Sequence, residues 1–358
     1  MAVKLRDIAK RVGTTPQTVS HVLNNRAAQM RISSELARRV KMTAKKMNYR
    51  PNRMAQSLRH QRSKTIGLVS PSIEREAAMT ELEQIQRILW SKGFKVLVGF
   101  SGNDLEHERE IMAEFRAMCV DGTILFPCEF SRTDQLKEFA DADPPVLLVN
   151  PPADYHGHFV RIDTQTGMRQ ALGHLLEQGH RHIAFLGIRK HLYLEQERID
   201  GIVDAYERAG VAPPEPQDYF HGDPPATERE DQYRVGHEGA CAIRDSGRGY
   251  TAIVARTDQI AIGAIRSLTE QHVAVPDDMA VLGYNGLPVA RYCSPALSTV
   301  APPVDKLGQV VVDFILKLIA GPSVDQPLQK TLTSELIIRE STRRPDAVEP
   351  FTDSNTNH

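Results

Sequence analysis

From Thr65 onward, short apolar segments alternate regularly with amphipathic stretches, so the chain must bury many short strands between helices. The first apolar segments read TIGLVSP, KVLVGFS, GTILFP and VLLVN, and stretches of helical periodicity such as ELEQIQRILWSKG separate them. Short runs bounded by Gly and Pro that alternate with helices are typical of βα units. The sequence therefore predicts an α/β core with parallel, Rossmann-like sheets.

The alternation is interrupted at Pro151–Pro152 and then resumes with FVRID, HIAFLG, YFHGD, TAIVA and MAVLGYN. We therefore expect two subdomains, at about 65–150 and 160–290. The next segment, 295–340, contains LSTVAPP, a helical stretch and LTSELIIRES. We expect this segment to return along the core and complete both sheets, and we expect the polar tail after Arg344 to be disordered.

Charge is distributed very unevenly along the chain. Residues 1–62 contain fifteen Lys or Arg and only two acidic residues, a net charge of +13. Residues 63–358 carry 29 basic and 43 acidic residues, a net charge of −14, so the formal charge of the whole chain is only −1. A basic segment attached to an acidic body predicts a module that meets a polyanion such as nucleic acid.

The composition, with 41% hydrophobic and 25% charged residues, is that of a soluble globular protein. No apolar run approaches the length of a membrane span, and the N-terminal MAVKLRDIAKRV lacks the apolar core of an export signal. We therefore expect a cytoplasmic protein without membrane association. The cysteines form no CxxC pair, which predicts reduced thiols; they are Cys119, Cys128, Cys241 and Cys293.

The basic segment has the periodicity of three short helices. Apolar residues recur at helical spacing from Leu5 to Val12, and Gly13 then interrupts the pattern. A second helix begins at Thr15, and a third begins near Ser33. A helix, a turn that contains Gly and a second helix, completed by a third, form the pattern of a helix-turn-helix domain.

The second of these helices lies in the stretch TTPQTVSHVLN, where Thr15 offers an N-cap and Pro16 takes the first helical position. One face is an apolar stripe of Val19, Val22 and Leu23. The other face carries compact or hydrogen-bonding side chains without a salt-bridge pattern, namely Pro16, Gln17, Ser20 and His21. By itself this pattern fits either an ordinary packed helix or a helix that lies on DNA.

The stretch YRPNRMAQSLRHQRSKT follows the third helix. Asn52 can cap a short helix that holds Met54, Ala55 and Leu58 among basic residues, but a free helix of this length is marginal in water. The stretch is therefore either a plain linker or a helix that folds only when a partner orders it. In a DNA-bound dimer, such a helix could wedge Leu58 between base pairs in the minor groove.

Several long motifs occur in one order along the chain: DIAKRVGTTPQTVSHVLN, YRPNRMAQSLR, KTIGLVSP, RIDTQTGMRQALGHLLEQGHRHIAFLG and TDQIAIGAIRSL with VPDDMAVLGYNGLPVARYCSPALSTV. With these motifs the chain resembles the LacI/GalR family of bacterial transcription regulators from about Lys4 to Arg343. The resemblance implies an all-α helix-turn-helix headpiece, a hinge helix and an α/β core of two periplasmic-binding-protein-like subdomains around an effector cleft. It also implies a homodimer that binds a near-palindromic operator in double-stranded DNA.

The resemblance divides the chain into a headpiece, a hinge, a core and a disordered tail, at 1–50, 51–63, 64–344 and 345–358. Within the core it implies a first subdomain of about 64–158 and 295–322. The second subdomain is then expected to comprise about 159–294 and 323–344.

The resemblance assigns DNA contacts to individual residues. Base-reading positions fall on Pro16, Gln17 and His21, and phosphate or turn-stabilising positions fall on Thr15, Thr18, Ser20 and Asn24. In the hinge, Leu58 matches the residue that enters the minor groove, and the residues expected beside it on DNA are Arg53, Ala55 and Arg59. Gln17 can pair bidentately with adenine, and His21 can donate to a guanine acceptor. Pro16 departs from the more usual polar or aromatic residue, so this position would read DNA shape or contact a thymine methyl.

The resemblance also implies the effector contacts, which are expected at Ser72, Asp163, Arg198, Arg256, Thr257 and Asn285. Arg198, in ERIDG, matches an Arg that contacts the effector. Thr257 stands where Asn is more usual, and Asn285 replaces an Asp that many relatives use to bind a sugar hydroxyl or a purine. Ala77 and Ala78 stand where relatives often carry aromatic side chains, which puts ring stacking in doubt.

These departures favour an anionic effector. One cleft carboxylate is absent, and Arg256 lies beside the end of a cleft strand with Arg198, Arg189, Lys190 and His191 on nearby loops. A bidentate Arg suits a carboxylate or a phosphate, so a sugar acid or a sugar phosphate is the hypothesis. In the other reading, Arg256, Arg189 and Lys190 face solvent at the rim.

An enzyme and an exported binding protein are the rival classes. The sequence contains no GxGxxG, GxxxxGK[ST] or GxSxG motif, and Asp163 has no implied partner acid or base. The pairs His156/His158 and His180/His182 approach metal-ligand spacing, but turn and packing roles are favoured. We expect no catalytic residue, cofactor or metal, and an exported binding protein would have a signal peptide and no basic headpiece.

The predicted function is therefore a transcriptional repressor of a carbon-metabolism operon, in which a small-molecule effector changes the orientation of the two subdomains. The alternative is a sugar- or metabolite-binding protein without a sequence-specific DNA function. The sequence leaves open whether the effector induces or co-represses, and whether the protein represses or activates. The polar tail shows no Leu heptad for tetramerisation, which favours a dimer.

Overall fold

The computed structural model describes residues 3–49, 62–72, 76–128, 131–188, 193–220, 231–321 and 326–343. The chain forms two compact units, Met1–Ser63 and Lys64–His358. Among the described residues, none of the helices is both long enough and apolar enough to cross a membrane.

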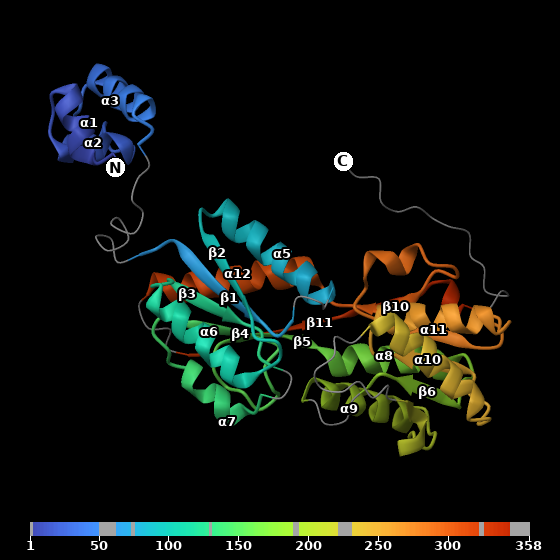
Figure 1. Ribbon diagram of the computed structural model, residues 1–358. Helices are drawn as coiled ribbons and strands as arrows, with labels where there is room; N and C mark the ends of the chain where they lie inside the picture. Colours follow the sequence, from blue (N-terminus) through green and yellow to red (C-terminus); the bar gives the residue numbers. More distant parts are fainter. Residues whose placement is uncertain are drawn as a thin grey trace. The chain divides into compact units, whose positions relative to one another are not determined.

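The first unit is a bundle of α1 (Leu5–Val12), α2 (Pro16–Leu23) and α3 (Ser34–Lys46), which confirms the three predicted helices (Figure 1). Gly13 ends α1 with a left-handed φ of 77°, a conformation that glycine adopts without steric cost. Ser33 caps α3 by accepting a hydrogen bond from the Leu36 N–H. The three helices bury a small core, to which Ile8, Ala9, Val12, Val19, Val22, Val40 and Ala44 contribute.

The second unit contains two sheets, and the first of them, sheet A, has the strand order β11-β5-β4-β3-β1-β2. Its neighbouring strands are paired in parallel. The strands are β1 (Thr65–Ser70), β2 (Lys95–Phe100), β3 (Gly122–Leu125), β4 (Val146–Val149), β5 (Phe159–Asp163) and β11 (Gln329–Thr333). The helices around this sheet are α5 (Glu76–Ser91), α6 (Leu105–Ala117), the short α7 (Thr133–Leu136) and α12 (Val304–Ala320).

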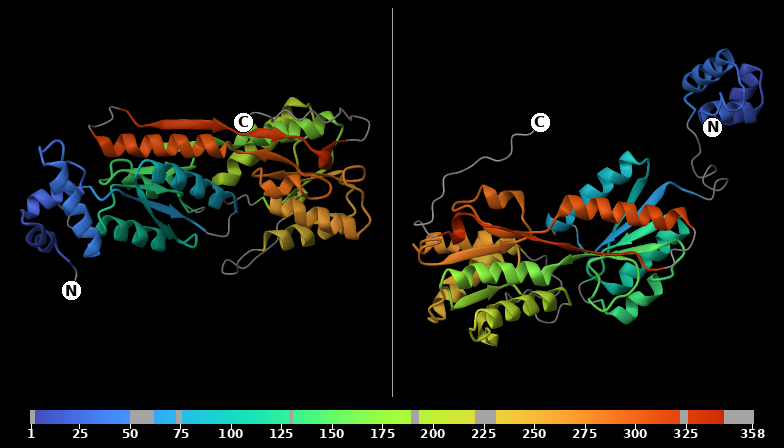
Figure 2. Two further views of the ribbon diagram at one scale, coloured as in Figure 1. Left: turned by 90° about the horizontal axis from the view of Figure 1, so that it is seen from above. Right: turned by 180° about the vertical axis from the view of Figure 1, so that it is seen from behind.

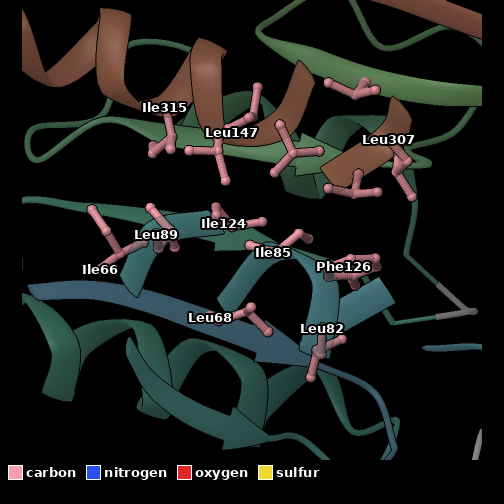
Figure 3. Packing of buried hydrophobic residues seen from close by; sticks show 14 of the residues in the cluster. Ile66, Leu68, Leu82, Ile85, Leu89, Ile124, Phe126, Leu147, Leu307 and Ile315 are labelled. Atoms are coloured by element: carbon pink, nitrogen blue, oxygen red, sulfur yellow. The ribbon is translucent and has the colours of Figure 1, made fainter. Parts of the chain in front are cut away.

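Alternation of side chains along the strands explains why helices cover both faces of sheet A. Ile66 and Leu68 of β1 pack with Ile85 of α5 and Ile315 of α12 in one cluster (Figure 3). Val69, on the opposite face of the same strand, packs in a second cluster with α6. Strands that are apolar on both faces are expected where a parallel sheet lies between two helical layers.

Sheet B has the strand order β12-β10-β9-β8-β6-β7. Among the described pairings, β10 with β12 is antiparallel and the others are parallel. Its strands are β6 (Ile183–Leu186), β7 (Tyr219–Phe220), β8 (Ala252–Ala255), β9 (Ala280–Tyr284), β10 (Ser298–Ala301) and β12 (Glu335–Ile337). The helices α8 (Thr164–Glu177) and α9 (Tyr193–Arg208) cover one face. The other face packs against α10 (Gln232–Asp245) and α11 (Asp258–Glu270).

Each apolar segment singled out in the sequence forms a strand, and the segment 295–340 completes both sheets as predicted. Figure 2 shows this segment, in orange and red, running along both subdomains. The boundaries of the subdomains nevertheless differ from those predicted. Residues 159–163 and 329–333, expected in the second subdomain, form β5 and β11 of sheet A, whereas residues 298–301, expected in the first, form β10 of sheet B.

The boundaries differ because a strand belongs to the sheet in which it is paired, and both β5 and β10 pair with the strand that precedes them in the chain. β5 pairs with β4 and β11, and β10 pairs with β9 and β12. The chain therefore passes from one sheet to the other after β5, after β10 and at Ser334, between β11 and β12.

Candidate functional site

The ends of α2 are fixed by local hydrogen bonds. Thr15 Oγ1 accepts from the Thr18 N–H at 3.1 Å, and the hydroxyl oxygens of these two residues lie 2.9 Å apart. At the other end, Asn24 Nδ2 donates to Ser20 Oγ at 3.3 Å. These four side chains therefore stabilise the turn and the helix itself, in agreement with a turn-stabilising role.

The outer face of α2 carries the side chains predicted to read bases. Pro16 and Gln17 are exposed, and His21, one turn after Gln17, is half-buried. Because residues four apart on a helix are neighbours, Gln17 and His21 share one face, opposite the buried Val19 and Val22. The predicted hinge contacts lie outside the described residues; they are Arg53, Ala55, Leu58 and Arg59.

The second unit contains a cleft of about 90 Å³ with walls from both subdomains. Its lining residues lie at or just beyond the carboxyl ends of strands, or on the helices α5, α8 and α9. They are Ser70, Pro71, Ala77, Ala78, Glu81, Phe126, Pro127, Val149, Asn150, Ile162, Thr164, Arg198, Tyr284, Asn285 and Pro302. This edge is where α/β sheets bind small ligands.

Two of the predicted effector residues, Arg198 and Asn285, line this cleft. The Arg198 guanidinium lies over the Tyr284 ring, 4.2 Å from its centroid, and its NH1 group donates to the Arg256 carbonyl oxygen at 2.7 Å. Asn285 follows β9 with a φ of 117°, a region that Asn visits more readily than most residues. Its N–H donates to the Val300 carbonyl oxygen at 2.9 Å, so its backbone is anchored to β10.

Buried polar atoms on both walls of the cleft lack a hydrogen-bond partner among the described residues. They are Ser70 Oγ on the first subdomain and Arg198 Nε and Tyr284 OH on the second. Buried polar atoms in native proteins are nearly always paired. A small molecule with hydroxyl or anionic groups matches this set, because it can both donate to and accept from such atoms.

Arg256 and Thr257 do not line the cleft. Arg256 is buried, and its Nε donates to Glu195 Oε1 at 2.7 Å, so it neither faces the effector site nor stands in solvent at the rim. Thr257 caps α11 by accepting from the Ile260 N–H, and its hydroxyl donates to Gln232 Oε1 at 2.7 Å. Both side chains thus have structural partners in the second subdomain.

Asp163 and Ser72 lie beside lining residues without lining the cleft themselves. Asp163 caps α8, since its Oδ1 accepts from the Thr166 N–H at 2.8 Å. Ser72 is half-buried and follows Pro71, which does line the cleft. The predicted rim residues Arg189, Lys190 and His191 lie outside the described residues.

Asp258 supports the second wall from behind. Thr299 Oγ1 donates to its Oδ1 and the Leu287 N–H donates to its Oδ2, each at 2.6 Å. Burial raises the pKa of Asp258 to about 6, because it outweighs the lowering effect of these two hydrogen bonds. The carboxylate thereby holds the backbone just after Asn285 in place.

Sequence reasoning missed several of the groups around the cleft. Ser70, Phe126 and Tyr284 each end or follow a predicted strand, so the strand-end rule could have indicated them. Glu195 gave no such signal, because its role depends on which side chains α9 buries. One histidine of each pair has a packing partner: His158 Nδ1 accepts from the Leu328 N–H, and His180 Nδ1 lies 2.9 Å from Thr251 Oγ1.

Comparisons with known proteins agree with this architecture. Residues 4–52 match the model for bacterial regulatory proteins of the lacI family, and residues 172–342 match a periplasmic binding protein-like domain. The HTH-type transcriptional regulator AscG of Escherichia coli K12 is 29% identical over 343 residues, which are 95% of this chain and 98% of AscG.

Two solved structures are also similar. A crystal structure of the lac repressor dimer bound to operator and the anti-inducer ONPF has a TM-score of 0.84 at 26% identity, over 96% of this chain and 99% of that one. A sugar-binding transcriptional regulator of the LacI family from Escherichia coli, complexed with phosphate, has a TM-score of 0.67 at 27% identity. It covers 78% of this chain and 98% of its own.

Proposed function

Because this chain belongs to the lacI family of bacterial regulatory proteins and is a DNA-binding transcriptional regulator, we propose that it is a repressor that binds a palindromic operator as a homodimer. Its affinity for the operator changes when a small molecule occupies the cleft between the subdomains. The observation that carries the proposal is the outer face of α2, where exposed Gln17 lies one turn from His21 in a segment with a net charge of +13. The protein acts in the cytoplasm.

The hinge completes DNA recognition in this proposal. Leu58 enters the minor groove at the centre of the operator, and Arg53 and Arg59 contact phosphates beside it. A helix as short as the predicted hinge is marginal alone, so its formation depends on DNA and on the geometry of the dimer. This dependence is what makes the hinge a suitable switch.

Exposed apolar side chains of the second unit support a dimer. Trp90 on α5 is 67% exposed, and Val98 on the neighbouring edge strand β2 is 48% exposed. Tyr292, which follows the 3-10 helix Pro288–Arg291 in the second subdomain, is 80% exposed. Large apolar side chains at the surface mark interaction sites when they gather, and an isologous interface places the same patch on both subunits.

The effector that we propose is a polar metabolite of carbon metabolism with one anionic group, such as a sugar acid or a sugar phosphate. Among the lining residues that the structure describes, Arg198 carries the positive charge and Glu81 of the first subdomain carries a negative one, while Ser70, Tyr284 and Asn285 supply groups for hydroxyls. A structural relative described as sugar-binding was solved with phosphate. Uncharged sugars that bound as tightly as the matching sugar acids would contradict this part of the proposal.

The switch acts through the relative orientation of the two cleft walls. Arg161 of β5 and Glu197 of α9 belong to different subdomains, because β5 is part of sheet A and α9 covers sheet B, and Arg161 Nε lies 4.0 Å from Glu197 Oε1. An effector that contacts both walls shifts the equilibrium only by its difference in affinity for the two orientations. Ion pairs such as Arg161–Glu197 change length when those walls move.

Selection of bound duplexes from a random DNA library by the purified full-length protein tests the proposal. We expect a palindrome whose half-site centres lie about one helical turn apart, with a flexible step at its centre. Recovery of duplexes without a shared sequence, with binding that only follows salt concentration, would favour the alternative of a metabolite-binding protein without a sequence-specific DNA function.

A further inference from the structure

The charged wall of the cleft contains two guanidinium groups that share one carboxylate. Glu195 and Arg198 are one helical turn apart on α9, and Arg256 follows β8. Arg256 Nε lies 2.7 Å from Glu195 Oε1, and Arg198 NH1 lies 3.8 Å from Glu195 Oε2. The Glu195 side chain is only 1% exposed, so all three charges interact with little screening by water.

The carboxylate is shared unequally. Arg256 makes a hydrogen bond to Glu195, whereas the distance from Arg198 to Glu195 is that of an ion pair without a hydrogen bond. Neither Glu195 Oε2 nor Arg198 Nε has a hydrogen-bond partner among the described residues. Arg198 is also held by the Arg256 carbonyl oxygen, which accepts from NH1 at 2.7 Å.

Only one member of this group reaches the ligand. Arg198 lines the cleft, while Glu195 and Arg256 lie behind it. Arg256 occupies Glu195 Oε1 with a hydrogen bond, so Glu195 neutralises Arg198 only in part. Arg198 can therefore attract a second anion. Within this cluster of described residues, two guanidinium groups and one carboxylate carry a net charge of one positive unit.

We infer that Glu195 and Arg256 are positioning residues that set the charge preference of the cleft: by dividing the Glu195 carboxylate between Arg256 and Arg198, they leave Arg198 able to bind one anionic group of the effector. This inference rests on the proposed function, because it assigns the ligand class of the same cleft. It gives Arg256 a role through Glu195 rather than by direct contact with the ligand.

The arrangement predicts opposite effects for two substitutions behind the cleft. Glu195→Gln removes the negative charge nearest Arg198, so an anion in the cleft should bind more tightly. Arg256→Gln leaves the carboxylate to Arg198 alone, so the same anion should bind more weakly. The double variant keeps Arg198 without either neighbour charge and should lie close to the natural protein, because its net charge at this wall is the same.

The test is calorimetric titration of the full-length protein with inorganic phosphate, gluconate and glucose 6-phosphate, with glucose as the uncharged probe. We expect Glu195→Gln to raise the affinity for the anions by about tenfold and Arg256→Gln to lower it by about tenfold, since opposite charges about 4 Å apart in a poorly solvated site interact strongly. The affinity for glucose should not change by more than about twofold in any variant. Arg256→Lys keeps the charge and should restore most of the affinity for anions.

A purely structural role would move all four ligands in one direction. The inference is overturned if both single variants change anion affinity with the same sign, or if no anion binds to any of the proteins at millimolar concentration. Circular dichroism melting identifies a variant that fails to fold, and Arg256→Lys then carries the comparison. If no operator sequence is selected but Glu195→Gln and Arg256→Gln change anion affinity in the expected opposite directions, the proposed function is rejected and this inference stands.

Discussion

At the scale of single residues, Gln17 and His21 are the side chains that we propose to read bases. Both side chains lie on the face of α2 opposite the buried Val19 and Val22, so they can be changed without disturbing the core of the first unit. A side-chain amide that pairs bidentately with adenine discriminates against the other bases by about 1–3 kcal/mol.

Gln17→Ala should therefore relax specificity at one operator position in each half-site, by about 1–3 kcal/mol. Titration of operators that carry each of the four bases at every position measures this change. The control is Gln29→Ala, an exposed glutamine in the turn after α2, which should leave the base preferences unchanged. An equal loss of affinity for all operator variants would show that Gln17 contacts the backbone instead of a base.

Asp258 provides a prediction of pH dependence. Its pKa is raised from 3.8 to about 6 in the folded protein, chiefly by burial. Between these two pKa values the folded chain binds more protons than the unfolded chain, so the free energy of unfolding falls as pH rises through this window. Above the window, this group no longer makes the free energy of unfolding depend on pH. The total change from this carboxyl is on the order of 3 kcal/mol.

Asp258→Asn should remove this contribution, so the difference in unfolding free energy between the natural protein and the variant should shift by about 2 kcal/mol between pH 4 and pH 6.5. Urea unfolding followed by circular dichroism at several pH values measures it. Asp277→Asn, which changes an exposed carboxylate, is the control. A constant difference across this range would mean that Asp258 titrates normally.

How far single residues could be predicted depends on how local their role is. The capping role of Thr15 follows from the residue type and its place before Pro16, and the structure confirms it. Arg198 and Asn285 were placed at the cleft by family motifs, and both line it. Arg256 was misplaced, because the direction of its side chain is decided by Glu195, 61 residues away in sequence, through burial that no local pattern reveals.

At the scale of elements, the packing of α10 on α11 depends on very close backbone approach. A Cβ atom at Gly263 would lie 2.0 Å from the Tyr233 carbonyl oxygen, and one at Gly236 would lie 1.9 Å from the Ile260 carbonyl oxygen. Backbone atoms cannot move aside as a flexible side chain can. These two glycines therefore set the distance between the helices that cover one face of sheet B.

Gly263→Ala should lower the free energy of unfolding by about 1–3 kcal/mol, the usual cost of overpacking a core. Gly173→Ala is a matched control within α8, because a Cβ atom there would meet no other atom within 4 Å. In that open position, alanine should stabilise the helix by up to about 1 kcal/mol. Thermal melting of both variants measures the contrast, and equal melting temperatures would contradict the close approach.

Elements were predicted well and their pairing was not. The strands and helices follow from apolar periodicity and from Gly and Pro punctuation, which are local signals. The assignment of β11 to sheet A depends on a neighbour far along the chain, because β11 pairs with β5. β5 and β10 each pair with the strand before them, but no local signal shows that the chain changes sheets after that strand instead of before it. A pattern of alternating strands and helices fixes neither the sheet that a strand joins nor the point at which the chain crosses between subdomains.

At the scale of the whole molecule, the proposed dimer determines how tightly an operator is bound, because each headpiece binds only one half-site. The exposed Trp90 and Val98 lie on the adjacent elements α5 and β2 of the second unit. A carboxylate in a buried interface without a partner costs several kcal/mol. A single charged substitution in this patch should therefore be enough to weaken the dimer.

Trp90→Asp should shift the protein from dimer towards monomer in sedimentation velocity and weaken operator binding by about tenfold or more. Gln170→Asp introduces a carboxylate on the exposed side of α8 and should remain dimeric. A Trp90→Asp protein that sediments as a dimer would place the subunit interface elsewhere on the second unit.

We propose above all that this regulator reads a specific operator sequence, and fluorescence anisotropy tests this claim. The affinities of the full-length protein for a selected palindrome and for a shuffled duplex of equal composition are compared at one physiological salt concentration. We predict that the palindrome binds about a thousandfold more tightly or better, as is usual for specific DNA-binding proteins. Affinities within about threefold of each other would show that the basic headpiece binds DNA only through its phosphates, and would contradict the claim.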